Sequence, residues 1–178
     1  QINAQGMQSN PTIIIRGVAS GASSNSVDPK VGIYIDGVYI GRAVGSLLEF
    51  GDIHRIEVLR GPQGTLFGRN TTGGAVNFIT RRPDLSGSEG YIQLGYGNFN
   101  TIPAQAAFET TLSPDVIGLR LAVNYADGDG QIQNVFAGGR DGNSTDTLQG
   151  RASLRISPGD ALDITLRGYA GRDRGTQA

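Results

Sequence analysis

The sequence predicts two structural parts: a small α+β globular unit over residues 1–83, and antiparallel β-strands over residues 84–178. Two observations lead to this prediction. Before residue 83 the apolar segments are short, mixed in type and linked by glycines. From about Glu89 onward, segments of about ten residues alternate apolar and polar side chains. Glycine is frequent, with 28 in 178 residues, which indicates many tight turns and close backbone contacts.

The first part is predicted from short β-rich runs and the turn signals between them. Its expected elements are strands at 12–18 and 31–42, a helical turn within 46–53, and strands at 54–61 and 73–83. The 31–42 segment divides at Asp36-Gly37, and this dipeptide favours a type I′ hairpin turn because both central residues need positive φ. Within 54–61, Ile56 and Val58 fall on one face of the strand.

The second part is predicted from alternation of side chains. Antiparallel strands are expected at 91–99, 101–112, 116–128, 146–157 and 161–172. The turns at 113–115 and 157–160 are short Ser-Pro turns, whereas the connection 127–146 is long and lies on the same side as 97–100. Short turns at one end and longer loops at the other are typical of outer-membrane barrels. A soluble β-sandwich shows the same alternation, so periodicity alone leaves both alternatives open.

Composition excludes several classes of protein. Fifteen basic residues against sixteen acidic ones give a formal net charge of −1, without the basic face of a nucleic-acid-binding protein. The absence of cysteine excludes disulfides and thiolate metal sites. No run of about 18 apolar residues predicts a transmembrane helix, and the N-terminus lacks the pattern of a signal peptide. We expect the chain to be a piece of a longer protein, because it starts without Met and soon enters a strand.

The glycine-rich stretch 58–83 does not have the spacing of a nucleotide-binding loop. Gly64 and Gly68 are followed by Arg69 and Asn70, not by Lys with Ser or Thr, and no helical segment is expected to follow these residues. The G-x-G-x-x-G pattern is also missing. We interpret these glycines as sites of tight turns and close backbone packing.

Catalytic and metal-binding patterns are equally weak. His54 is the only histidine, and a surface or capping role is favoured over that of a base oriented by Glu57. Asp127, Asp129 and Asp141 raise the possibility of calcium binding, but the EF-hand spacing is not present, so a solvated loop is the favoured interpretation. We therefore expect no catalytic residues, no metal site and no cofactor.

Three motifs in order carry a resemblance to a known family. IIIRGV (13–18), VGIYIDGVYIG (31–41) and IEVLRGPQGTLFGRNTTGGAVNFITRRP (56–83) resemble the plug domain of TonB-dependent outer-membrane receptors. The matching signature positions are Gly17, Asp36, Gly37, Glu57, Gly61, Pro62, Gly64, Gly68, Gly73, Gly74 and Asn77. The resemblance implies that 1–83 is a plug domain without its N-terminal part. It also implies that 84–178 contributes the first five or so antiparallel strands of a transmembrane β-barrel of about 22 strands.

The resemblance also implies a function. Receptors of this family take up a scarce, bulky nutrient across the bacterial outer membrane, most often a ferric siderophore, and the plug gates the barrel. The implied partners are the TonB protein, outer-membrane lipid and the nutrient, and the segment that contacts TonB is expected outside this chain. Alternatives are a receptor of the same family for haem, cobalamin or a glycan, one that signals to a transcriptional regulator, or a soluble β-rich binding module.

Individual residues take roles from the resemblance. Arg16 and Arg60 match plug arginines that pair with barrel carboxylates and hold the plug in place, since a buried guanidinium needs a charged partner. The loops that follow the first motif and the hairpin match ligand-contacting loops. Their first candidates are Ser23, Asn25, Tyr39, Arg42 and Ser46. The guanidinium of Arg42 suits an anionic iron chelate.

Overall fold

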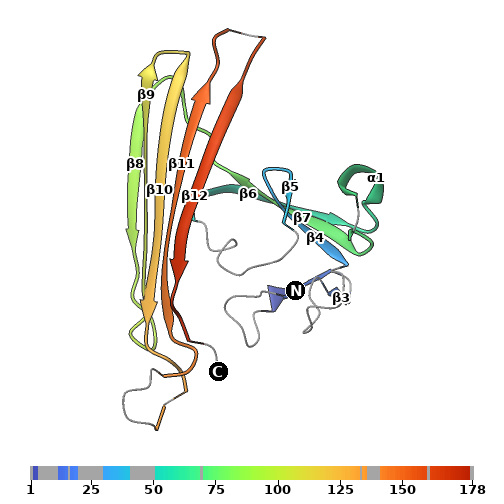
Figure 1. The fold of residues 1–178 in the computed structure, drawn as a ribbon, viewed down its shortest axis with the longest axis vertical. Helices are drawn as coiled ribbons and strands as arrows, with labels where there is room; N and C mark the ends of the chain where they lie inside the picture. Colours follow the sequence, from blue (N-terminus) through green and yellow to red (C-terminus); the bar gives the residue numbers. More distant parts are fainter. Residues whose placement is uncertain are drawn as a thin grey trace. The chain divides into compact units, whose positions relative to one another are not determined.

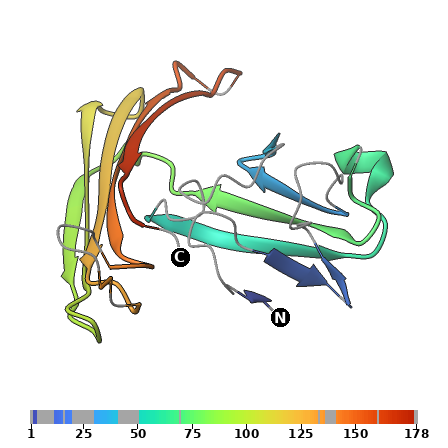
Figure 2. The same ribbon diagram turned by 60° about the horizontal axis from the view of Figure 1, so that its bottom comes forward.

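The computed structural model describes residues 2–3, 12–15, 17–19, 30–40, 51–68, 70–132, 134–135, 141–159 and 161–176. The chain forms two compact units. One contains residues 1–48 and 53–80, and the other contains residues 49–52 and 81–178. The short segment 49–52 therefore belongs to a different unit from the residues on either side of it. Figures 1 and 2 show the sheets of each unit.

The first unit contains two small sheets. In one, β1 (Ile2–Asn3), β2 (Thr12–Ile15) and β3 (Val18–Ala19) pair in that order. The single strand expected at 12–18 is in fact two antiparallel strands, because Gly17 adopts φ 80° and turns the chain between them. The other sheet has the order β5-β4-β7-β6. Its strands are β4 (Val31–Ile35), β5 (Val38–Tyr39), β6 (Ile53–Arg60) and β7 (Gly74–Thr80).

The core of the first unit lies between these two sheets. Ile15 from β2, Val31 and Ile33 from β4, and Val76 from β7 are buried together. Burying such a side chain contributes roughly 1.5–3 kcal/mol, so this cluster joins the parallel pair β4–β7 to the first sheet. The alternation expected along β6 is present, but its Ile56 and Val58 are each 53% exposed and lie outside this core.

The predicted hairpin turn at Asp36-Gly37 is confirmed. Asp36 has φ 50° and Gly37 has φ 82°, as a type I′ turn requires, and the flanking strands β4 and β5 pair antiparallel.

No helix follows the glycines of 61–68, as expected, but a single helical turn lies between two of them. The four-residue helix α1 (Gly64–Phe67) ends at Gly68, whose φ is 75° and whose N–H donates to the Gly64 carbonyl. Most of the helical turn expected within 46–53 lies outside the described residues. Its last residues are not helical, since 51–52 is irregular and Ile53 begins β6.

The second unit is a five-stranded antiparallel sheet in which each strand pairs with its neighbours in sequence. The strands are β8 (Ser88–Leu94), β9 (Ile102–Ser113), β10 (Ile117–Gly128), β11 (Thr145–Ile156) and β12 (Ile164–Asp173). The β9–β10 and β11–β12 turns lie together at the upper end in Figure 1, and the other two connections lie at the lower end. The predicted placement of the connections at the two ends is confirmed, and the β9–β10 turn is short and the β10–β11 connection long, as expected. The β11–β12 connection, 157–163, is longer than predicted and equals the β8–β9 connection, 95–101, because β12 begins only at Ile164.

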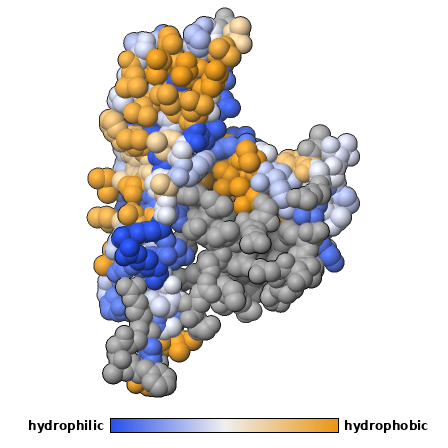
Figure 3. Space-filling view, viewed as in Figure 1, coloured by the Kyte–Doolittle hydropathy of each residue, from blue (hydrophilic) through white to orange (hydrophobic). Residues whose placement is uncertain are grey.

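The two faces of this sheet have an unusual distribution of side chains. The apolar face is exposed: Ile92 is 78% exposed, Leu94 74% and Leu166 57%. The polar face is buried, and it carries Glu109, Thr147, Gln149, Arg151, Ser153 and Arg120. Figure 3 shows apolar side chains gathered on the surface of these strands. A soluble sandwich buries its apolar face, so this sheet has the opposite arrangement, which suits lipid on one side and protein on the other.

Within the described residues, no helix has the length and apolar character needed to cross a membrane.

Gly74 provides a test of close packing in the first unit. It adopts φ 144°, and a Cβ there would collide with the Leu59 carbonyl oxygen and lie 3.0 Å from Ile15 Cδ1. We expect Gly74→Ala to destabilise this unit by about 1–3 kcal/mol through backbone strain alone. Trypsin should then cleave residues 1–80 of the protein faster. Gly64→Ala is the matched control, because a Cβ at Gly64 meets no atom within 4 Å. Equal cleavage of the two variants would contradict the prediction.

Candidate functional site

A group of buried charges lies on the polar face of the second unit's sheet. Its members are Asp52 from the segment 49–52, Glu109 from β9, Arg120 from β10 and Arg151 from β11, and we call them the Asp52 cluster. The side chains are 0%, 6%, 3% and 2% exposed, respectively. Alternation places these strand residues on the same face, because successive side chains of a strand point to opposite sides.

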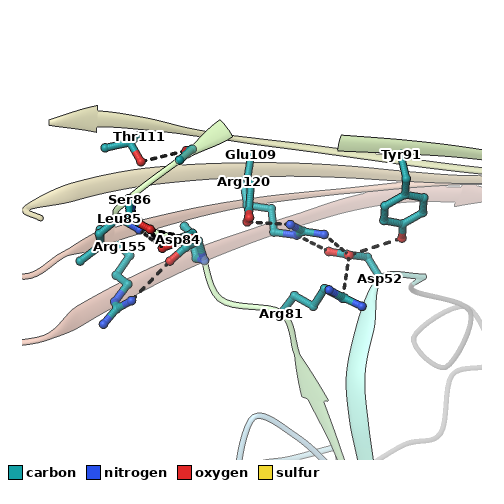
Figure 4. Close-up of polar contacts among 12 residues, drawn as sticks. Asp52, Arg81, Asp84, Leu85, Ser86, Tyr91, Glu109, Thr111, Arg120 and Arg155 are labelled. Atoms are coloured by element: carbon teal, nitrogen blue, oxygen red, sulfur yellow. Dashed lines mark hydrogen bonds and ion pairs between the residues drawn. The ribbon is translucent and has the colours of Figure 1, made fainter. Parts of the chain in front are cut away.

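The two arginines hold the Asp52 carboxylate from neighbouring strands. Arg120 donates from Nε to Asp52 Oδ2 at 2.8 Å and from Nη2 to Oδ1 at 2.5 Å, which is a bidentate pair. The Arg120 Nη1 also donates to Glu109 Oε2 at 2.6 Å (Figure 4). Arg151 Nη2 donates to Asp52 Oδ2 at 2.5 Å. The negative charges of two carboxylates therefore balance the positive charges of two guanidinium groups at a place that is shielded from solvent.

The backbone of the same segment is held as well. Arg151 donates from Nη2 to the Asp52 carbonyl at 2.9 Å and from Nη1 to the Gly51 carbonyl at 3.3 Å. Gly51 lies so close to the sheet that a Cβ there would overlap the amide group of Gln105 and lie 3.1 Å from Asn124 Oδ1. A side chain at position 51 would therefore have to displace the Gln105 amide from its place on the sheet.

Further polar groups surround the cluster. Tyr91 on β8 donates its hydroxyl proton to Asp52 Oδ1 at 3.4 Å and accepts from Gln105 Nε2 at 2.9 Å. Arg81 Nε lies 3.8 Å from Asp52 Oδ1, at the open side of the cluster (Figure 4). These groups are hydrogen-bond donors and charges in fixed positions, with no nucleophile or oriented base among them. The arrangement holds a chain segment against the sheet and does not resemble a reaction centre.

The connecting segment 81–87 is fixed to the same sheet. No side chain fits at Gly118 on β10, because a Cβ there would collide with the Asp84 carbonyl oxygen. Asp84 accepts hydrogen bonds from the Ser86 hydroxyl and from backbone N–H groups, which lower the pKa of the Asp84 carboxyl. Arg155 pairs with Asp163 at 2.8 Å, and this hydrogen-bonded pair lowers the pKa of Asp163.

The signature positions of the first unit form a second network. Asp36 at the hairpin turn accepts from the N–H and hydroxyl of Thr80 at 2.9 and 2.8 Å. Asn77 Oδ1 accepts from the Gly37 N–H, and its Nδ2 donates to Glu57 Oε2 at 3.2 Å. The network therefore joins the hairpin turn to β7 and β6. The signature positions Asp36, Gly37, Glu57 and Asn77 thus connect elements of the first unit, which their match to the motif alone did not reveal.

Arg55 and Glu57 form an exposed ion pair, and Arg55 also contacts His54. Arg55 Nε donates to Glu57 at 2.8 Å, and its Nη1 lies 3.1 Å from His54 Nδ1. Hydrogen bonds from Arg55, first, and from Asn77 lower the pKa of Glu57. Glu57 is thus bound to Arg55 and does not orient His54 as a catalytic base.

Tyr39 is the one predicted ligand-contacting residue that the structure describes. Its ring lies 5.5 Å from that of Tyr34, and its hydroxyl accepts from Asn70 Nδ2 at 2.9 Å. Tyr34 in turn packs edge-on against Phe67 at 4.8 Å and donates to the Phe67 carbonyl. Burial, followed by the nearby Tyr39, raises the pKa of Tyr34. This aromatic group joins the hairpin to α1.

The other predicted site residues are less well placed. Five of them lie outside the described residues, namely Ser23, Asn25, Arg42, Ser46 and Arg16. Arg60 is exposed at the end of β6 and forms no ion pair with the described part of the chain. Its pairing with a barrel carboxylate therefore stays a prediction.

The loop aspartates of the calcium hypothesis serve local hydrogen bonds. Asp129 accepts from Asn100 Nδ2 at 2.6 Å, and Asp141 accepts from the Asn134 N–H at 2.8 Å. Across the described ranges, no three His, Asp or Glu side chains are grouped so that they could hold a metal ion.

The Asp52 cluster was not predicted from the sequence. Only the pair of Glu109 and Arg120 could have been predicted, because the short turn after β9 sets a register in which these two residues lie opposite each other. Nothing local to Asp52 indicates that it joins these strands, since it lies far earlier in the chain.

Comparison with known proteins places these features in context. Residues 1–75 match the family model of the TonB-dependent receptor plug domain. The pesticin receptor of Yersinia enterocolitica is 30% identical over 149 residues, which cover 84% of this chain and 22% of that protein. The vitamin B12 transporter of Vibrio vulnificus is 31% identical over 141 residues, or 68% of this chain and 22% of the relative.

A solved structure is similar over almost the whole chain. The ferric yersiniabactin uptake receptor of Yersinia pestis matches with a TM-score of 0.86 and 28% identity. The match covers 99% of this chain and 28% of the receptor. The present chain therefore spans about a quarter of the length of the proteins it resembles.

Proposed function

Because this chain belongs to the TonB-dependent receptor family, we propose that the complete protein takes up a ferric siderophore across the outer membrane. In this proposal, residues 1–83 are the plug that gates the pore, and residues 84–178 are the first strands of the barrel. Energy is supplied through TonB. Family membership makes the protein an outer-membrane receptor of a Gram-negative bacterium and not an enzyme.

One observation carries the membrane part of the proposal. The five strands of the second unit expose their apolar face and bury charged residues on the other. Such a sheet is stable when lipid covers the apolar side and protein covers the polar side. The buried Asp52 cluster supports the second condition, because it needs a chain segment packed on the polar face to balance its arginines.

The relatives support a siderophore as the substrate. The structure with a TM-score of 0.86 is that of a receptor for ferric yersiniabactin. We propose Ser23, Asn25, Tyr39, Arg42 and Ser46 as contacts for the chelate, with Arg42 binding its negative charge. A second candidate substrate is cobalamin, which is favoured by the identity to the vitamin B12 transporter.

Uptake by the complete receptor tests the proposal. A strain that lacks the receptor gene would be complemented with the full-length gene and supplied with ⁵⁵Fe-loaded siderophores, including ferric yersiniabactin, or with labelled cobalamin. We expect accumulation of iron from a ferric siderophore that requires both the receptor and TonB. Accumulation of cobalamin alone would favour the second candidate. Normal assembly in the outer membrane without TonB-dependent uptake of either class would contradict both.

A further inference from the structure

The segment 49–52 is bound to the sheet of the second unit although the chain continues from it directly into β6 of the first unit. Its fixation uses a carboxylate, two backbone carbonyls and a glycine. The Asp52 carboxylate is held by arginines of β10 and β11. The carbonyls of Gly51 and Asp52 accept from Arg151, and Gly51 packs directly on Gln105 of β9.

Releasing this segment is costly for the sheet itself. Arg120 and Arg151 are 3% and 2% exposed, and Asp52 is their shared partner. If Asp52 moved away, Arg120 would keep only Glu109, and Arg151 would lose the carboxylate to which it donates. Leaving a buried charge without its partner is strongly destabilising, so the segment is bound more firmly than a surface contact would be.

We propose that residues 49–52 are a stationary anchor, which stays bound to β9, β10 and β11 throughout the transport cycle. This inference rests on the proposed function, because it concerns what moves during uptake. The chain then enters β6 from a fixed point, and the rearrangement that admits the nutrient takes place in parts of the plug other than 49–52. Asp52, Arg120 and Arg151 are thereby positioning residues for the plug.

Gln149 on β11 gives a direct probe of the anchor. It is 2% exposed and lines a small void of about 10 Å³ together with Gly51 and Arg151. Its amide makes no hydrogen bond to the described part of the chain. Gln149→Cys therefore removes no contact of the cluster, and the thiol it introduces is covered while 51–52 stays in place.

The experiment measures the rate at which a small methanethiosulfonate reagent modifies this cysteine in an otherwise cysteine-free full-length receptor. At rest, we expect slow modification, and adding Asp52→Asn should accelerate it at least tenfold. Adding Asp163→Asn instead should leave the rate unchanged, since that carboxylate is exposed and lies outside the cluster. Fast modification of the resting single variant, or no acceleration by Asp52→Asn, would overturn the anchor.

The same rate is then measured with TonB present while the receptor transports iron from whichever of the tested ferric siderophores it accumulates. We expect a rate within twofold of that at rest, because 49–52 stays bound. A tenfold or larger increase during measured uptake would overturn the proposal. The measurements at rest do not depend on transport, so absent uptake would count against the proposed function, whereas loss of protection at rest would count against the anchor.

Discussion

Replacing Asp52 by Asn is expected to loosen the resting receptor more than any other single change in the cluster. The substitution keeps the size of the side chain but removes the charge that Arg120 and Arg151 share in a buried position. Breaking a buried ion pair from one side costs about 3–5 kcal/mol. Here Arg151 loses its carboxylate partner without gaining water, and Arg120 keeps only Glu109. The temperature at which the full-length receptor loses its compact, fast-migrating form on a gel should therefore fall, and leakage of large antibiotics such as vancomycin should rise.

Two comparisons separate this effect from general damage. Asp163→Asn breaks an exposed pair with Arg155 and should change neither readout measurably. Asp52→Asn combined with Arg120→Met should cost less than the sum of the single changes, since both partners of the bidentate pair are then neutral. Wild-type stability and leakage in Asp52→Asn, or strict additivity in the double variant, would contradict the role given to the cluster.

Leu121→Arg tests the opposite face of the same strand. Leu121 lies next to Arg120 in β10, is 46% exposed and pairs across the sheet with Phe108 and Ala152. If this face contacts lipid, an arginine near the middle of the membrane costs about 2–4 kcal/mol. We expect less folded, heat-modifiable receptor in the outer-membrane fraction and a lower urea midpoint for what is folded.

Leu121→Met is the matched control, because it keeps the volume and apolar character of the side chain and should assemble normally. If the arginine variant assembles as well as the methionine variant, the exposed apolar face does not contact lipid. Such a result would remove the main physical support for the membrane assignment.

Local chemistry made several parts of the fold predictable from the sequence. Asp36-Gly37 predicted a turn with two positive φ values, because few other residue pairs adopt them without strain. The five amphipathic segments predicted the strands of the second unit, since a two-residue period is visible within one segment. Periodicity could not tell which face is covered by solvent, lipid or protein. The burial of Arg120 and the exposure of Leu121 show which face the protein covers.

The candidate site was much less predictable, because its contacts join distant parts of the chain. Resemblance to the family directed attention to Arg16 and Arg60 as plug cations. The buried pairs found here have the opposite polarity, with Asp52 as the anion and strand residues Arg120 and Arg151 as the cations. The one-turn helix α1 was not predicted because four residues are too few to show a helical period.

If β8–β12 present one face to lipid and the other to protein, successive residues of one strand lie in different surroundings. The most direct test attaches a nitroxide to single cysteines at positions 121, 122, 123 and 124 of the full-length receptor in membranes. Collisions with lipid-soluble oxygen and with a water-soluble nickel complex are then compared by electron paramagnetic resonance. We expect frequent oxygen collisions at 121 and 123 and few collisions of either kind at 122 and 124. Equal values at all four positions, or frequent nickel collisions at 121 and 123, would contradict it.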